Sequence, residues 1–326
     1  MRVAVIGAGA VGGTIAALLD RAGHAVEVTA RGRHLETIGA DGIRLNGAWG
    51  EHTARVEAGE TLSQSPDIAF VSTKARDAEA ALLTNAPFLP GIPVVVIQNG
   101  LEGPGAAGRA APRSDVVGGL ALYAASFLSP GEITVTSPGA TYLGGELLPT
   151  LYALRLLAPV MPTVSTDNFV GAQWTKLVVN HINALPAITG LSAQEVISHR
   201  GLRLVMTESM REAVRVGIAR GITFETMQGL GNTRLRLLAA LPAGLGQLVP
   251  RLMSRRMGRR PNPGSTLQSI RRGQPTEIDY LNGAVVAAGR ELGVPTPVDE
   301  ALVALVHEVE DSGDFLSPEQ VLQRIG

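Results

Sequence analysis

The first residues of the chain constrain its fold more than any other segment. An uninterrupted apolar run at 3–6 leads directly into a glycine-rich turn, and a helical pattern follows from Thr14. The turn consists of Gly7, Ala8, Gly9, Ala10, Val11 and Gly12. A strand, a GxGxxG turn and a helix in this order are the fingerprint of a dinucleotide-binding βαβ unit. We expect Gly7 to form the turn, Gly9 to admit a pyrophosphate and Gly12 to permit close helix packing, with the first helical N–H groups facing the phosphates.

Short apolar runs alternate with helical stretches up to about residue 140. Examples of these runs lie at 25–28, 68–71 and 94–97. Continuous apolar strands that alternate with helices predict a parallel sheet with helices on both faces. Later β-like runs, separated by proline and glycine, lie at 116–119, 133–135 and 141–143. We expect these later runs to form an antiparallel extension of the same sheet.

Beyond residue 167 the pattern becomes helical. Helical periodicity is found at 169–185, 192–220, 277–292 and 299–312. A chain of 326 residues is long enough for two domains of ordinary size. The sequence therefore predicts an α/β Rossmann domain at 1–166, with a parallel sheet and an antiparallel extension, followed by an all-α domain at 167–326.

Composition excludes several functional classes. The net charge is -1 and hydrophobic residues make up 45% of the chain, so no nucleic-acid or membrane partner is expected. Without cysteine the chain can form neither disulfides nor thiolate metal sites, and we expect no metal centre. The strand pattern begins at Val3, which leaves no room for a signal peptide and predicts a cytoplasmic protein. The oligomeric state stays open, a homodimer included.

The residues after the second predicted strand bear on the choice of cofactor. An NAD-binding domain commonly has an acid there for the ribose diol, whereas this chain has Arg31 and Arg33 after Thr29-Ala30. A guanidinium can bind a 2′-phosphate through forked hydrogen bonds, and a carboxylate would repel it. We therefore expect NADP (NADPH) rather than NAD or FAD, with Arg31 reading the phosphate. A solvated basic loop is the alternative.

Lys74 and Asn99 follow the fourth and fifth predicted strands. Ligands of an open parallel sheet bind beyond the carboxyl ends of its strands. We therefore expect both residues on the nicotinamide side of the cofactor site. The Asn99-Gly100 pair is equally compatible with simple turn chemistry.

Lysine is rare in this chain. Of 28 basic residues only Lys74 and Lys176 are lysine, and the other 26 are arginine. A coding bias toward arginine explains the totals, but a retained lysine is expected where a cation must shift its pKa, since guanidinium cannot release its proton. Lys176 lies in an otherwise apolar helix with Asn180 and Asn183 at i+4 and i+7, so the three side chains are predicted to share one face. A lysine at a helix margin with its ammonium in solvent is the alternative.

Two features of the second domain are less specific. The segment TEIDYLNG at 276–283 is predicted to open a helix, and a helix start alone would account for Glu277. Between residues 226 and 276 there are nine arginines and no acid, which would attract anions. The nine include Arg255, Arg256, Arg259, Arg260, Arg271 and Arg272.

Taken together, these motifs resemble the ketopantoate reductase family over almost the whole chain. The shared segments are GAGAVG at 7–12, Lys74, Gln98-Asn99-Gly100, Trp174-Thr175-Lys176-Leu177 with Asn180, and TEIDYLNG. The resemblance implies a Rossmann domain, a helical domain and an active site between them, in which NADPH reduces the small 2-oxoacid 2-dehydropantoate to pantoate.

The resemblance also implies roles for individual residues. Lys176 would be the general acid, Glu277 would hold the substrate hydroxyl and Ser265 would bind the substrate carboxylate. The other residues implied to contact substrate or cofactor are Asn99, Asn180 and Asn262, with Lys74 at the cofactor.

The sequence departs from the family pattern at two positions. The second asparagine of the lysine helix, expected four positions after Asn180, is Asn183, and Ser269 stands where an aspartate is expected. The segment 229–263 is also unusually rich in glycine and arginine. These departures concern substrate identity more than reaction type. Two alternatives therefore remain, a reductase of another small 2-oxo or 3-hydroxy acid and an NADPH-sensing module without catalysis.

Overall fold

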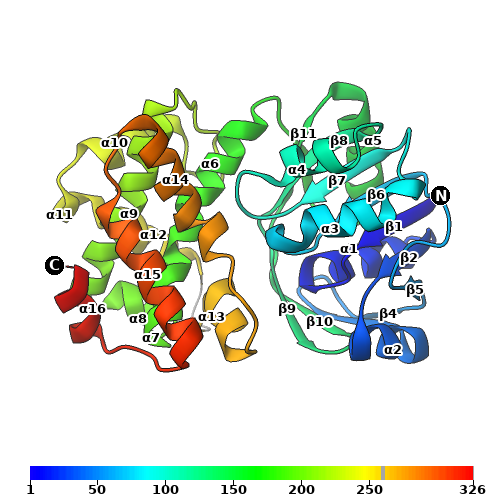
Figure 1. Ribbon diagram of the computed structural model, residues 1–326, viewed down its shortest axis with the longest axis horizontal. Helices are drawn as coiled ribbons and strands as arrows, with labels where there is room; N and C mark the ends of the chain where they lie inside the picture. The colour runs from blue at the N-terminus through cyan, green and yellow to red at the C-terminus, as the bar shows by residue number, and fades with distance from the viewer. Residues whose placement is uncertain (258–260, 326) are drawn as a thin grey trace. The chain divides into compact units, whose positions relative to one another are not determined.

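The computed structural model describes residues 1–257 and 261–325. They form two compact units, Met1–Phe169 and Val170–Gly326, which are coloured from blue to green and from green to red in Figure 1. The boundary lies close to the one expected after residue 166. Arg259 and Arg260 lie outside the described residues.

The first unit is built on an eight-stranded sheet with the order β12-β11-β8-β7-β6-β1-β2-β5. Its strands are β1 (Arg2–Ile6), β2 (Ala25–Thr29), β5 (Glu57–Gly59), β6 (Ile68–Val71), β7 (Pro93–Ile97), β8 (Asp115–Ala121), β11 (Thr141–Gly145) and β12 (Thr163–Ser165). All neighbouring pairs are parallel except β8 with β11. Strands β1, β6 and β7 are buried almost throughout, as expected for a sheet covered on both faces.

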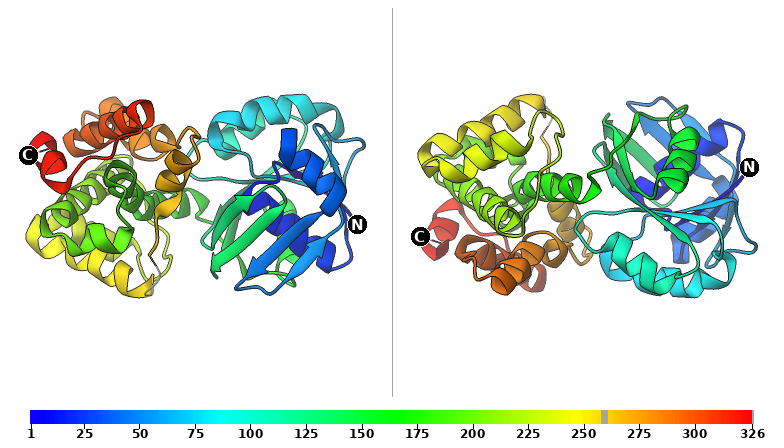
Figure 2. Two further views of the ribbon diagram at one scale, coloured as in Figure 1. Left: turned by 90° about the horizontal axis from the view of Figure 1, so that it is seen from below. Right: turned by 90° about the horizontal axis from the view of Figure 1, so that it is seen from above.

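The antiparallel extension was predicted too broadly. Strand β8 continues the parallel sheet, and the direction reverses only at β11, which β12 then follows in parallel. The run at 133–135 belongs to a separate sheet, β4-β3-β10-β9, visible in Figure 2. The strands of this sheet are β3 (Ile43–Gly47), β4 (His52–Ala54), β9 (Ala124–Ser129) and β10 (Glu132–Ser137). Burial alternates along β10, with Ile133 and Val135 inside, which is the pattern of a sheet buried on one face only.

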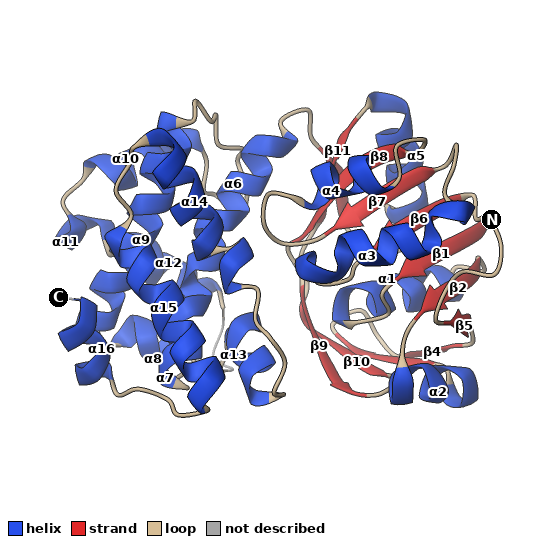
Figure 3. Cartoon of the chain, viewed as in Figure 1, coloured by secondary structure: helices blue, strands red, loops and turns tan. Residues whose placement is uncertain are grey.

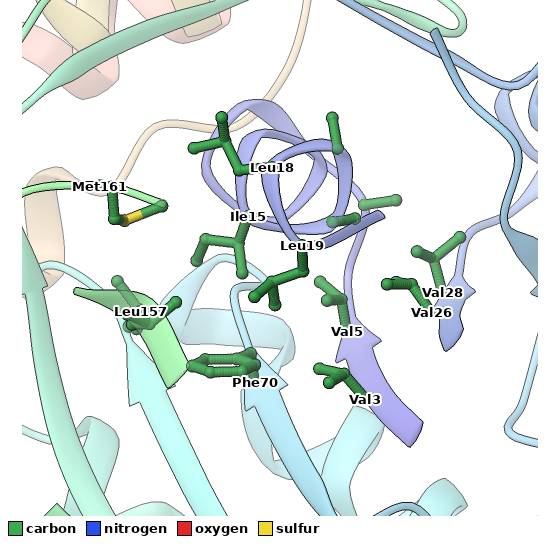
Figure 4. Packing of buried hydrophobic residues seen from close by; sticks show 14 of the residues in the cluster. Val3, Val5, Ile15, Leu18, Leu19, Val26, Val28, Phe70, Leu157 and Met161 are labelled. Carbon is green, nitrogen blue, oxygen red and sulfur yellow. The ribbon is translucent and has the colours of Figure 1, made fainter. Parts of the chain in front are cut away.

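Helix α1 (Ala10–Arg21) carries the phosphate-binding turn into the core of the first unit. Ile15, Leu18 and Leu19 are fully buried and lie over β1, β2 and β6, whose side chains are shown in Figure 4. A Cβ atom at Gly13 would lie 2.1 Å from Cδ1 of Ile133, so β10 packs closely against another side of the same helix. The small sheet therefore completes the burial of α1.

The remaining helices cover the large sheet or form the second unit (Figure 3). Those of the first unit are α2 (Gly32–Asp41), α3 (Ala75–Asn85), η1 (Ala86–Phe88), α4 (Gly103–Ala110) and α5 (Leu147–Leu157). Those of the second are α6 (Phe169–Asn180), η2 (His181–Asn183), α7 (Ala184–Thr189), α8 (Ala193–Ser198), α9 (Arg200–Ala219), α10 (Asn232–Ala240), α11 (Ala243–Gly246), α12 (Leu248–Arg256), α13 (Gly264–Arg271), η3 (Ile278–Tyr280), α14 (Asn282–Leu292), α15 (Pro297–Ser312) and α16 (Pro318–Ile325). Within the described ranges, no helix combines the length and apolar character needed to cross a membrane.

Three of the four predicted long helices are interrupted. The helix expected at 169–185 ends at Asn180, because the ring of Pro186 would clash with the carbonyl of residue 182 in a continuous helix. The helix expected at 192–220 breaks at His199, whose side chain accepts a hydrogen bond from the N–H of Leu202 and caps α9. The helix expected at 277–292 begins only at Asn282, after a short 3-10 turn.

Candidate functional site

The glycine-rich turn has the geometry that a dinucleotide needs. Gly7 has φ +94°, and a side chain there would meet the backbone N of Thr73 at 2.9 Å. A Cβ at Gly12 would lie 2.1 Å from the carbonyl oxygen of Gly7, so the helix can approach the turn only without one. At Gly9, in contrast, nothing described lies within 4 Å of the added Cβ position. The turn therefore leaves open space over Gly9, at the N-terminus of α1, where a pyrophosphate fits.

A pocket of about 280 Å³ opens beside this turn. It is lined by Thr29, Ala30, Arg31, Glu60, Thr73, Lys74, Asp77, Ala81, Thr84 and Asn85. Thr29 adjoins the turn directly, because its hydroxyl accepts a hydrogen bond of 3.0 Å from the N–H of Gly7. In a Rossmann unit the end of the second strand is where the adenosine ribose binds. The pocket thus has the position of an adenosine-ribose site.

Lys74 lines this pocket together with Arg31. The expectation that Lys74 lies on the nicotinamide side is not met, because Lys74, directly before α3, shares this pocket with the residues at the end of β2. Arg31 is exposed, two residues after the end of β2, and its predicted contact with a 2′-phosphate stays a prediction. Thr29, Glu60, Asp77 and Thr84 also line the pocket, and no motif in the sequence pointed to them.

The ends of β6 and β7 are tied together by Gln98. Its amide donates to the carbonyl oxygen of Thr73 at 2.7 Å, and its buried Oε1 has no hydrogen-bond partner among the described residues. Asn99 follows directly, partly exposed, at the carboxyl end of β7. The cofactor role predicted for Asn99 stays a prediction.

His34 fixes the turn from the other side. Its Nδ1 accepts a hydrogen bond from the N–H of Gly131, and its Nε2 lies 2.7 Å from the carbonyl oxygen of Ala8, to which it donates in that tautomer. Burial lowers the pKa of His34 below its ordinary value, although the bond to Ala8 opposes this. His34 is therefore a neutral residue that positions the glycine-rich turn, rather than a cation for the cofactor.

Lys176 is buried in the second unit. Its side chain, on α6, is 8% exposed, so the alternative of a lysine with its ammonium in solvent is wrong. Burial lowers the pKa of Lys176 to about 8, and the negative charge of Glu277 opposes the shift. The fold thus brings Lys176 and Glu277, far apart in sequence, within electrostatic reach of each other. A lysine with this pKa is mostly protonated at neutral pH and can release a proton readily.

The other predicted substrate residues are arranged around the end of the lysine helix. Asn180 lies one turn after Lys176, and its buried Nδ2 has no hydrogen-bond partner among the described residues. The predicted i, i+4, i+7 stripe ends there, because Asn183 lies in η2 rather than in α6. A Cβ at Gly264, which has φ +71°, would lie 2.5 Å from Oδ1 of Asn183. Asn183 therefore contacts the start of α13, where Ser265 is exposed.

Asn262 has a local structural role. Its Oδ1 accepts from the N–H of Gly264 at 2.9 Å, and its main chain bonds to Ala193 and to the side chain of Gln194. These bonds hold the turn before α13 in place. A direct contact of Asn262 with substrate stays a prediction.

Glu277 is not in the first turn of a long helix. It precedes η3, and α14 begins five residues later at Asn282. The hydroxyl of Thr276 accepts from the N–H of Ile278, so it caps the short turn instead. A favourable interaction with the start of a long helix therefore does not explain the acid at position 277.

A buried polar cluster with no local signal in the sequence joins the lysine helix to the segment that follows Glu277. His181 and Asp299 are fully buried, with Nε2 and Oδ2 3.4 Å apart, and Nδ1 of His181 donates to the carbonyl of Leu177. Asp299 also accepts from Ser209 and, at 2.8 Å, from the amide of Asn282. The cluster therefore connects η2, α9, α14 and α15 and fixes the end of α6 relative to the chain that follows Glu277.

Glu212 completes this cluster at the start of α15. Its carboxylate accepts from the N–H groups of Val298 and Asp299 at 3.0 and 2.8 Å. Burial raises the pKa of Glu212 to about 7, against the effect of the N–H of Asp299. Burial lowers the pKa of His181, but Asp299 outweighs it and raises the pKa above its ordinary value.

Both shifts predict that stability depends on pH. The folded protein binds these two protons more tightly than the unfolded chain does, so their contribution is complete at low pH and is lost as the pH rises through the folded pKa values. We expect the free energy of unfolding to fall by about 1 to 3 kcal/mol between roughly pH 5 and 8. Denaturant unfolding at several pH values measures this. Glu212→Gln should flatten the profile, whereas Glu308→Gln, at an exposed position, should not; an unchanged profile for Glu212→Gln would contradict the assignment.

Comparison with known proteins places both units of the chain in one family. The family described as "Ketopantoate reductase PanE/ApbA" matches residues 3–146, and "Ketopantoate reductase PanE/ApbA C terminal" matches residues 168–310. A 2-dehydropantoate 2-reductase from Mesorhizobium japonicum is 31% identical over 340 aligned positions, covering 95% of this chain and 98% of that protein.

Solved structures agree with this result. A PanE/ApbA family ketopantoate reductase from Ralstonia eutropha JMP134 has a TM-score of 0.83 and 31% identity, covering 95% of this chain and 99% of that one. D-mandelate dehydrogenase, solved with NADH and anilino(oxo)acetate, shares the fold with a TM-score of 0.81 at 21% identity, covering 97% of this chain and 100% of that one. The protein belongs to the ketopantoate reductase family of oxidoreductases.

Proposed function

We propose that the protein is an NADPH-dependent 2-oxoacid reductase that converts 2-dehydropantoate to pantoate, a step of pantothenate and coenzyme A biosynthesis in the cytoplasm. The observation that carries the proposal is the buried Lys176, whose pKa is lowered to about 8 within reach of Glu277. A proton donor tuned in this way is needed when a ketone becomes an alkoxide. A sensor that only binds NADPH has no use for it.

The cofactor part of the proposal is supported by the first unit. The open space over Gly9 fits a pyrophosphate, and Arg31 with Lys74 places two cations in the adjoining pocket, where a 2′-phosphate would bind. Bound NADPH would supply a hydride to the carbonyl carbon of the substrate.

The residues of the second unit would then handle the oxygen of that carbonyl. The ammonium of Lys176 polarises the carbonyl before the hydride arrives and donates a proton to the oxygen as negative charge develops there. Glu277 accepts a hydrogen bond from the substrate hydroxyl and keeps Lys176 protonated. Nδ2 of Asn180 lies one turn along the same helix and has no hydrogen-bond partner within the described part of the chain, so it would donate to a substrate oxygen.

The direct test is NADPH oxidation by the purified protein with 2-dehydropantoate, beside a panel of other 2-oxoacids. We expect the highest kcat/KM with 2-dehydropantoate. The two departures in the sequence, Asn183 and Ser269, favour the alternative of another small 2-oxo or 3-hydroxy acid, and a different best substrate in the panel would establish it. Binding of NADPH without turnover of any oxoacid would establish the sensor.

Glu277→Gln is expected to separate binding of substrate from binding of cofactor. Loss of the carboxylate should raise KM for 2-dehydropantoate by about tenfold, since a hydrogen bond to a charged group contributes about 1.5 to 3 kcal/mol. The Kd of NADPH should change little. The loss of a neighbouring negative charge should also lower the pKa of Lys176, so the alkaline limb of the pH–rate profile moves to lower pH. A change in thermal stability alone, with unaltered kinetics, would mean that Glu277 is structural.

A further inference from the structure

The large sheet brings an acidic side chain next to the end of β2, although no acid directly follows β2 in the sequence. Strand β5 pairs with β2 so that Gly59 lies opposite Thr29, and the N–H of Ala30 donates to the carbonyl of Gly59 at 2.9 Å. The next residue is Glu60, which lines the same pocket as Ala30 and Arg31. A neighbouring strand thus delivers a carboxylate to the place where an NAD-binding domain has its ribose-binding acid.

The charges of this pocket are balanced. Arg31 and Lys74 are its cations, and Glu60 and Asp77 are its anions. Asp77 lies 3.6 Å from Nε of Arg76, so its charge is partly offset. The side chains of Arg31 and Glu60 are both exposed and form no ion pair with any described residue. Each is therefore available to a ligand in the pocket.

A positive side chain and a negative side chain suit two different ribose substituents. A guanidinium pairs with a 2′-phosphate, and a carboxylate accepts hydrogen bonds from the free ribose hydroxyls but repels a phosphate. A pocket built only for NADPH would gain affinity by having no acid at position 60. We propose that this pocket binds both nicotinamide dinucleotides, with Glu60 as the specificity-determining residue that accepts from the ribose diol of NADH and limits the preference for NADPH.

This proposal rests on the proposed function only because it requires that the protein bind a nicotinamide dinucleotide. It does not depend on which oxoacid is the substrate. Removal of the carboxylate should act in opposite directions on the two cofactors. For an exposed charge we expect NADH to bind roughly three- to tenfold more weakly and NADPH roughly two- to fivefold more tightly. A merely structural residue would change both affinities in the same direction.

Fluorescence titration of the full-length protein with NADH and with NADPH tests this without any substrate. Glu60→Gln and Glu60→Ala are compared with Glu57→Gln, which makes the same charge change at the start of β5, three residues before Glu60, at an exposed position that does not line the pocket. The expected result is a shift of the NADH-to-NADPH Kd ratio in both Glu60 variants, larger in Glu60→Ala, and none in the control.

The other outcomes overturn the proposal in distinguishable ways. Equal changes for both cofactors, no change at Glu60, or an equal shift in Glu57→Gln would refute a specific role of Glu60 and leave the proposed function standing. Failure of the wild-type protein to bind either dinucleotide would refute both. A wild-type Kd for NADH more than about a thousandfold above that for NADPH would show that the pocket excludes NADH.

Discussion

Replacement of Lys176 with alanine is expected to lower the turnover of oxoacid reduction by about 10²- to 10⁴-fold, the usual effect of removing a positioned general acid. The Kd of NADPH should stay nearly the same, because Lys176 belongs to the second unit and not to the dinucleotide-binding turn. Single-turnover kinetics with saturating NADPH measure the chemical step directly. A small primary amine added to Lys176→Ala should restore part of the rate.

Lys176→Arg distinguishes proton donation from simple electrostatic attraction. The guanidinium keeps the positive charge but is a poor proton donor near neutral pH, so turnover should stay low. In the wild type, turnover should fall as the pH rises above about 8, the pKa that burial gives Lys176. Near-wild-type turnover of Lys176→Arg, or a rate that is flat between pH 7 and about 10, would mean that the proton comes from elsewhere.

Arg31→Ala is expected to weaken NADPH binding by roughly 10- to 150-fold, which corresponds to the loss of one charge-assisted pairing. NADH binding should change little, because NADH has no 2′-phosphate. Arg33→Ala is the matched control, since Arg33 is exposed on α2 and does not line the pocket. Isothermal titration with both cofactors provides the measurement. Equal losses for NADH and NADPH would remove Arg31 from phosphate recognition.

Local patterns predicted the elements whose signals lie within a few residues. The strand, the glycine-rich turn at 7–12 and the helix start follow one another directly, and the structure has the turn expected at Gly7 and the close packing expected at Gly12. The pyrophosphate contact expected at Gly9 stays a prediction. The apolar helix around Lys176 left two alternatives, an ammonium that reaches solvent and a buried functional one, and only the structure shows that the side chain is buried.

Pairings between distant segments were not predictable in the same way. The apolar run at 133–135 predicts a strand, but the neighbouring residues contain no signal that its partner is β3 rather than the edge strand of the large sheet. Glu60 follows a three-residue strand that has too few residues to show a period, so its place beside Arg31 emerges only from the register with β2. His181 and Asp299 are separated by more than a hundred residues, and neither looks unusual in its own helix.

One missed boundary did have a local signal. Pro186 lies one residue beyond the helix expected at 169–185. Proline is tolerated in the first turn of a helix, but in a helix interior its ring clashes with the carbonyl four residues earlier. A stricter use of that rule would have ended the lysine helix earlier and separated Asn183 from Lys176 and Asn180.

The second sheet also determines the order in which the first unit can fold. Helix α1 is synthesised early, but one side of it is covered by β10, which is synthesised much later. Strand β10 also pairs with β3, so that Glu132 lies opposite Arg44, which is distant in the sequence. Pairing β3 with β10 closes a long loop, and the entropic cost of closing it precedes the gain from the contact. This cost slows folding. The phosphate-binding turn is therefore expected to gain protection from hydrogen exchange only after residues up to Ser137 have left the ribosome, although its own sequence is complete at residue 12.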